Sequence, residues 1–211
     1  MKEKPIIFST PMVKAILEGR KTQTRRVMKP QPELKDGFWR WAGAGWSDGI
    51  RKVTPIPCHS MYNRMPYQPD DILWVRETWC YGKDTHAIMF DPEPIPGDIL
   101  YKADFPELDK EIVKWRPSIH MPKEAARLFL RVKNVRVERV QDITEEDAKA
   151  EGVIPFPYDP EGDCWNDGKY KTAFEYLWNT LHGWNPNAWG RNDWVWVIEF
   201  ERIQESEVEK G

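Results

Sequence analysis

Residues 5–27, PIIFSTPMVKAILEGRKTQTRRV, set the start of the fold, because they predict a strand, a short helix and a second strand in direct succession. The first four residues form an apolar run that is typical of a strand. Ser9 or Thr10, followed by a proline, predicts a helix start with a capping hydroxyl. Apolar residues then recur at helical spacing, and Gly19 supplies the left-handed residue that ends the helix. The residues after this glycine are therefore expected to be extended.

A basic cluster follows this helix directly, with no acidic residue among its members. One interpretation is that its first cations complement the negative end of the helix and that the rest form a solvated face. The other interpretation is that the cluster binds an anionic partner, because arginine offers a planar fork for phosphate groups or base edges. The sequence leaves both open. The members of the cluster are Arg20, Lys21, Arg25, Arg26 and Lys29.

Lys21 and Thr24 form a candidate chemical pair within the cluster. The pKa of a lysine amine falls on burial, and a neutral amine can act as a base. Thr24 follows three residues later, within reach of the amine if the backbone turns between them. An unactivated threonine is a poor nucleophile, so it requires such a neighbouring base.

Glu151 is a second candidate, placed by the segment around it. The sequence TEED at 144–147 resembles a capping box and predicts a short helix that ends at Glu151 and Gly152. The helix dipole disfavours a negative charge in the last turn by a few tenths to about 1 kcal/mol, which suits a group that transfers protons. The alternative is a solvated residue at a helix end.

His120 and Glu77 complete the candidate residues. His120, between two apolar residues, can serve as a base, as a contact to a nucleobase or as a hydrogen-bonded structural residue. Glu77 follows a strand and is included among the predicted substrate-binding residues. The other histidines lack ligand spacing to one another, to the cysteines or to paired carboxylates, so we predict no metal site and no cofactor.

Composition excludes several classes of protein. The 211 residues carry a formal net charge of −3, which argues against coating nucleic acid by bulk electrostatics, so any nucleic-acid site must be local. The three cysteines are widely spaced and odd in number, which favours neither a disulfide framework nor a zinc ribbon. No long apolar run follows the N-terminus. We therefore expect a cytoplasmic protein without a signal peptide or membrane span.

The rest of the chain predicts several strands with short helices packed outside them, an α+β fold built on a small mixed β-barrel. Residues 1–211 are expected to form a single domain with long loop insertions at about 30–70, 80–122 and 153–192. Within 128–140 the apolar phase shifts by one residue, which predicts a β-bulge or barrel corner. Further strands are expected at 72–76, 99–102 and 194–203, and helices after Pro106 and through the apolar stripe of Phe174, Leu177, Trp178 and Leu181.

Three segments resemble the ASCH family, small relatives of the RNA-binding PUA domains. Residues 16–26 are similar to its Gly-x-Lys-x-x-x-x-Arg signature, which Gly19, Lys21 and Arg26 satisfy. Residues 143–152 resemble a later helix of the family, and 70–75 resemble a barrel strand. The insertions resemble those of phage- and prophage-borne ASCH proteins. The resemblance implies a PUA-like barrel whose pocket recognises a nucleoside, a nucleotide, RNA or modified DNA.

The resemblance also implies a chemistry, because one bacterial ASCH enzyme is an amidohydrolase that removes the acyl group from N4-acetylcytidine. Matched motif to motif, its lysine, threonine and glutamate fall on Lys21, Thr24 and Glu151. Lys21 would activate Thr24 for attack on the amide carbonyl, and Glu151 would handle protons or orient the amine. Two alternatives stay open: a binding module without turnover, and a ribonuclease. In each case Arg20, Arg25, Arg26, Glu77 and His120 are the predicted substrate-binding residues.

Overall fold

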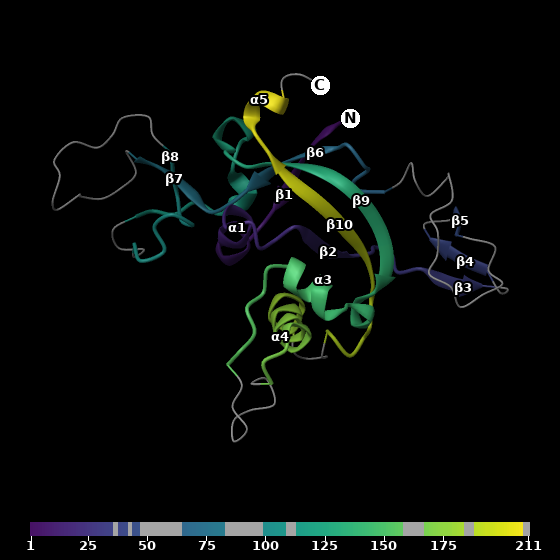
Figure 1. Cartoon of the computed structure of the whole chain (residues 1–211). Coiled ribbons are helices and arrows are strands. Elements are labelled where there is room, and N and C mark those ends of the chain that lie inside the picture. Colours follow the sequence, from purple (N-terminus) through teal and green to yellow (C-terminus); the bar gives the residue numbers. More distant parts are fainter. Residues whose placement is uncertain are drawn as a thin grey trace. The chain divides into compact units, whose positions relative to one another are not determined.

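A computed structural model describes residues 1–35, 38–41, 44–46, 65–82, 99–108, 113–157, 167–183 and 188–208 (Figure 1). The chain divides into two compact units. Whether they behave as one domain with three insertions stays a prediction. Unit 1 contains Met1–Glu18, Asp71–Arg131 and Arg202–Gly211, and unit 2 contains Gly19–Asp70 and Val132–Glu201.

Unit 1 is built on a parallel strand pair. Strand β1 (Glu3–Ile7) pairs in parallel with β6 (Ile72–Arg76), and β6 pairs in antiparallel register with the start of β9 (Phe129–Arg139). Pro5 lies within β1, and a proline lacks the N–H of a ladder bond, which suits an edge strand. The other elements of this unit are α1 (Thr10–Leu17), β7 (Trp79–Tyr81), β8 (Ile99–Tyr101), η2 (Ser118–His120), η3 (Lys123–Ala125) and α5 (Glu205–Val208).

Helix α1 begins and ends as the sequence predicts. Ser9 occupies the N-cap position in an extended conformation, with a proline in the first turn, although its hydroxyl makes no capping hydrogen bond. Gly19 has φ +73°, the left-handed conformation that glycine adopts without strain. The helix buries Val13, Ala15 and Ile16.

Unit 2 is built on antiparallel strands. Strand β2 (Gln23–Val27) pairs with β10 (Trp194–Ile203), with Thr24 opposite Ile198 and Arg26 opposite Trp196. Helix α3 (Glu145–Ala150) begins at Thr144, whose Oγ1 accepts a hydrogen bond from the Asp147 N–H, as a capping box predicts. The unit also contains β3 (Glu33–Lys35), β4 (Phe38–Trp41), β5 (Ala44–Trp46), η4 (Val140–Asp142) and α4 (Tyr170–His182).

The core of unit 2 forms between α4 and the sheet. Phe174 and Trp178 of α4 pack with Val195 and Val197 of β10. These two aromatic residues confirm half of the predicted apolar stripe, but Leu181 is 48% exposed, since it lies in the last turn of the helix. The helix stops at Gly183, which has φ +102°.

Three further expectations need correction. The segment 30–70, expected to have little regular structure, contains the three-stranded sheet β3–β4–β5. The helix expected after Pro106 is a turn as far as Leu108, and 109–112 lie outside the described residues. The fold is mixed α+β, but the described strands pair in the open order β1–β6–β9–β10–β2 and form no closed barrel. A closed barrel would require β1 to pair with β2, but these two strands lie at opposite ends of the order.

Two smaller expectations concern β9 and the cysteines. Within β9, the consecutive residues Lys133 and Asn134 are both exposed, at the position where the apolar phase was expected to shift by one residue. Cys80 is buried and lies in no disulfide among the described residues, while Cys58 and Cys164 lie outside them. No helix among the described residues is long and apolar enough to span a membrane.

Candidate functional site

The centre of the candidate site is a buried ion pair between Lys21 and Glu151, both in unit 2. The two residues form an isolated antiparallel bridge between the segments before β2 and after α3. The Lys21 Nζ donates to Glu151 Oε2 at 2.7 Å and to the Glu151 carbonyl oxygen at 2.9 Å. Lys21 is 2% exposed and Glu151 is 3% exposed. The structure therefore brings together two residues 130 positions apart, and it neutralises the carboxylate that the helix dipole disfavours.

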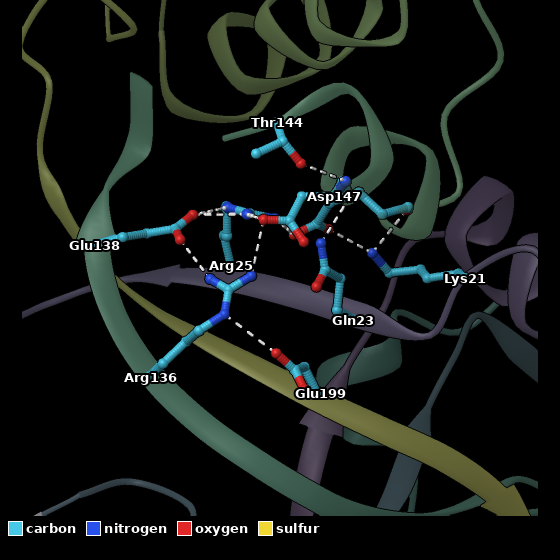
Figure 2. Close-up of polar contacts among 9 residues, drawn as sticks. Lys21, Gln23, Arg25, Arg136, Glu138, Thr144, Asp147 and Glu199 are labelled. Atoms are coloured by element: carbon cyan, nitrogen blue, oxygen red, sulfur yellow. Dashed lines mark hydrogen bonds and ion pairs between the residues drawn. The ribbon is translucent and has the colours of Figure 1, made fainter. Parts of the chain in front are cut away.

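Arg25 extends this ion pair into a network with three carboxylates (Figure 2). Its Nη1 donates to Glu151 Oε1 at 3.0 Å, and its Nη2 donates to Asp147 Oδ2 at 3.0 Å. Its Nε and Nη2 donate to Glu138 Oε1 at 2.8 and 2.6 Å. Because the Arg25 side chain is fully buried, these carboxylates replace the water that its charge would otherwise require.

Arg136 of β9 extends the network toward solvent. It donates to Asp147 Oδ2 at 2.8 Å, to Glu199 Oε1 at 3.1 Å and to Glu138. Gln23 joins from β2, where its Nε2 donates to the Asp147 carbonyl oxygen at 2.7 Å. Figure 2 shows these side chains converging from β2, β9, β10 and α3.

Burial and charge set the pKa values in this network. Burial lowers the pKa of Lys21 below its ordinary value, although the charge and hydrogen bond of Glu151 oppose the shift. The cations of Arg26 and Arg25 lower it further. For Asp147, partial burial raises the pKa, but Arg136 and Arg25 outweigh burial and hold it below its ordinary value. The network thus combines an amine that loses its proton more readily with a carboxylate that gains one less readily.

The opposite face of β2 has a different character. Side chains alternate along a strand, so Thr24 and Arg26 project away from the face of Gln23 and Arg25. Their cross-strand partners are Ile198 and Trp196, and cross-strand partners share a face. The Trp196 ring packs edge-on against Trp41, with ring centroids 5.3 Å apart.

Arg26 connects this face electrostatically to the ion pair. Burial lowers the pKa of its guanidinium, and the nearby groups Tyr67 and Glu151 partly offset the shift. Burial also raises the pKa of the Tyr67 phenol. Since the charge of Arg26 in turn lowers the pKa of Lys21, the two faces of β2 influence one another at the Lys21 end.

Glu77 and His120 belong to unit 1. Glu77 is 1% exposed and accepts hydrogen bonds from Arg127 Nε at 3.0 Å and Arg127 Nη2 at 3.2 Å. Burial raises the pKa of this carboxyl, even though Arg127 opposes the shift. Arg127 also donates to Asp104 at 2.5 Å and stacks over Tyr101, 3.9 Å from its ring centroid. His120 is exposed at the end of η2.

Of the predicted site residues, Lys21 and Arg25 both donate hydrogen bonds to Glu151. Arg20 lies beside them, with its Nη1 donating to the Gly152 carbonyl oxygen at 2.6 Å. Thr24 is buried on the other face of β2, so its proposed activation by Lys21 stays a prediction. Sequence reasoning missed Arg136, Glu138, Asp147, Glu199 and Tyr67, and the only local signal among them is Asp147 in the capping sequence.

The described residues thus define a mixed α+β protein with a buried ionic network at one end of β2. Within them, no three His, Cys, Asp or Glu side chains are grouped so as to hold a metal ion. No family model and no curated protein matches the sequence.

Among solved structures, the chain is similar to the crystal structure of protein EF3133 from Enterococcus faecalis V583, described as family-model DUF984. The two chains are 12% identical with a TM-score of 0.39, over 100% of this chain and 82% of the other. A likeness at this level carries no argument about family or function.

Proposed function

We propose that the chain is an ASCH-type protein with a PUA-like fold that recognises a nucleobase on the face of β2 carrying Thr24 and Arg26. The base would belong to a nucleoside, a nucleotide, RNA or modified DNA. The observation that carries the proposal is the partly buried guanidinium of Arg26, with Trp196 as its cross-strand partner and Tyr67 within electrostatic range.

The chemistry of this face suits a nucleobase. A guanidinium can donate two parallel hydrogen bonds to a base edge or to a phosphate. Hydroxyl groups, here those of Thr24 and Tyr67, can donate or accept. Aromatic side chains stack on bases of any sequence. Arg25 does not contribute, because three carboxylates of the protein already accept its hydrogen bonds.

Calorimetric titration with cytidine, cytidine monophosphate and a ten-residue single-stranded RNA tests the proposal. We expect Arg26→Met to weaken binding of the tightest of these ligands by about tenfold or more, since a bidentate contact contributes about 1–3 kcal/mol. Lys29→Met removes an exposed cation at the end of β2 and is the matched control. Absence of binding by the unmodified protein, or equal binding by Arg26→Met, would refute nucleobase recognition on this face.

A second candidate function, amide hydrolysis of N4-acylated cytosine, is favoured by the Lys21–Glu151 pair. An amine whose pKa is lowered by burial, next to a carboxylate, is typical of a group that moves protons. In this hypothesis Lys21 takes the proton of the Thr24 hydroxyl, and the Thr24 oxygen attacks the amide carbonyl. Glu151 orients the Lys21 amine or passes the proton to the departing exocyclic nitrogen of cytosine, as the amide C–N bond breaks and the acyl group stays on Thr24 as an ester. Water then hydrolyses this ester, which releases the acyl group as a carboxylic acid and restores the Thr24 hydroxyl.

Incubation with N4-acetylcytidine separates the two candidates. Release of cytidine that is lost in both Lys21→Ala and Thr24→Val supports hydrolysis. Binding of N4-acetylcytidine without release, weakened by Arg26→Met, supports recognition alone. Release that persists in Lys21→Ala would rule out the assigned roles.

A further inference from the structure

A hollow of about 600 Å³ lies in unit 2, next to the Lys21–Glu151 bridge but not lined by either residue. Its walls come from the segment before β2, from α3 and the residues after it, and from the start of α4. Arg20 and Thr22, which flank Lys21 in sequence, line one side, and Val153 and Ile154 line another. Thr24 and Arg26 do not line it, so the hollow is separate from the proposed nucleobase site.

The size and lining of the hollow suit an organic ligand. Ligand pockets commonly enclose about 300–1,000 Å³ and are mostly apolar, with a few polar groups that fix orientation. Here the apolar surface comes from Val153, Ile154, Pro155 and the ring of Tyr170. Ile154 is 69% exposed, and a ligand in the hollow would remove part of this apolar surface from water.

The charged residues of the lining favour an anion. Arg20 and Lys149 are cationic, and Glu146 is the anionic residue of the lining. The Lys149 ammonium is held 5.9 Å from the centroid of the Tyr170 ring, so a cation lies next to the aromatic wall. The Arg20 Nη1 donates to the Gly152 carbonyl oxygen at 2.6 Å, which holds this guanidinium next to the segment that lines the hollow.

We propose that this hollow binds a small organic carboxylate with an aromatic or branched apolar body. Arg20 and Lys149 hold the carboxylate, and the apolar body lies against Ile154 and Tyr170. The ligand would join two segments that already share a hydrogen bond from the Thr22 N–H to the Ala150 carbonyl oxygen at 2.9 Å. It would therefore stabilise the segments that hold the Lys21–Glu151 pair.

Methyl NMR of protein labelled at isoleucine and valine tests the proposal, with phenylacetate as the probe and its neutral analogue phenylacetamide as the matched compound. At constant ionic strength, phenylacetate is expected to shift the Ile154 and Val153 methyl signals saturably. Phenylacetamide is expected to bind at least about tenfold more weakly, because charge-assisted hydrogen bonds are roughly twice as strong as neutral ones. Equal affinity for the two compounds, or saturable shifts that spare both residues, would overturn the proposal.

Substitutions test the role of each charged residue of the lining in binding phenylacetate. Arg20→Met is expected to weaken phenylacetate binding about tenfold, Lys149→Met severalfold, and Glu146→Gln to strengthen it. Because Arg20 also supports Gly152, Arg20→Lys keeps the charge and should recover most of the affinity. Lys29→Met, which removes a cation outside the lining, should leave the affinity unchanged. Unchanged affinity in both Arg20→Met and Lys149→Met would contradict the assignment, and weaker binding in Glu146→Gln would contradict the role given to charge.

Discussion

Arg25 and Arg26 are neighbours in β2, yet they meet opposite environments. Arg25 donates hydrogen bonds to Glu138 of β9, to Asp147 of α3 and to Glu151 directly after α3. Arg26 projects from the other face, opposite Trp196 and near Tyr67. The alternation of a β-strand is enough to produce this difference, because adjacent side chains point to opposite faces.

The comparison shows that a basic cluster in a sequence does not define one site. The anionic partner that the cluster requires is supplied for Arg25 by the protein itself. Lys21 is likewise paired with Glu151. Arg26 lies on the other face of β2, where we propose that the ligand binds, so changes to the two faces should have separable effects on stability and on binding.

The largest expected effect is the loss of stability in Arg25→Met. Removing one partner of a buried ionic network leaves uncompensated carboxylates and costs about 3–5 kcal/mol. Urea denaturation should show this loss, whereas Arg26→Met should lose less than half as much. Equal losses in the two variants would show that the two faces do not differ as described.

Lys21→Met should have the next largest effect, a loss of about 2–3 kcal/mol in the free energy of unfolding. The loss is smaller than for Arg25 because Glu151 keeps the hydrogen bond from Arg25 Nη1. The double variant Lys21→Met/Glu151→Gln removes both charges of the pair and should be less destabilised than the sum of the single variants. Additive losses would mean that the Lys21–Glu151 contact contributes little.

Asp147→Asn should cost about 1–2 kcal/mol near neutral pH, since Asp147 accepts hydrogen bonds from two arginines. The folded-state pKa of Asp147 is lowered, so its ionised form stabilises the protein above its unfolded-state pKa of about 4. This contribution is lost as the pH falls through the lower, folded-state pKa. Unfolding measured from pH 6 to pH 3 should therefore be less pH-dependent in Asp147→Asn, and an identical acid dependence would exclude Asp147 as a contributor.

Thr24→Val should have the smallest effect on stability, within about 1 kcal/mol, because the two side chains are nearly isosteric and the network lies on the other face. The affinity for cytidine or cytidine monophosphate, measured by calorimetric titration, should nevertheless fall. A stability loss as large as that of Lys21→Met would place the Thr24 hydroxyl in a structural role instead.

Much of the secondary structure could be predicted from local signals. Gly19 ends α1, Thr144 caps α3, and the apolar alternation of residues 194–203 matches the bounds of β10. These signals act within a few residues, so the sequence displays them directly. The sheet of β3, β4 and β5 escaped prediction, because its strands have only three or four residues in a segment rich in proline and glycine.

The site could be predicted only in part. Lys21, Arg25 and Glu151 were each recognisable as candidates from their positions after a helix or at a helix end. Glu138 and Glu199 gave no such signal, because each lies in a strand with ordinary alternation and acquires its role from partners far away in the sequence.

The sequence by itself determined where α1, α3 and β10 begin and end, because caps, glycines and apolar periods act locally. Only the tertiary structure decided which charges meet. Lys21 and Glu151 are joined across 130 residues because the segments before β2 and after α3 form a bridge. The strand alternation that separates Arg25 from Arg26 is visible in the sequence. The carboxylates on one face of β2 and the aromatic residues on the other come from distant segments, and only folding brings them together.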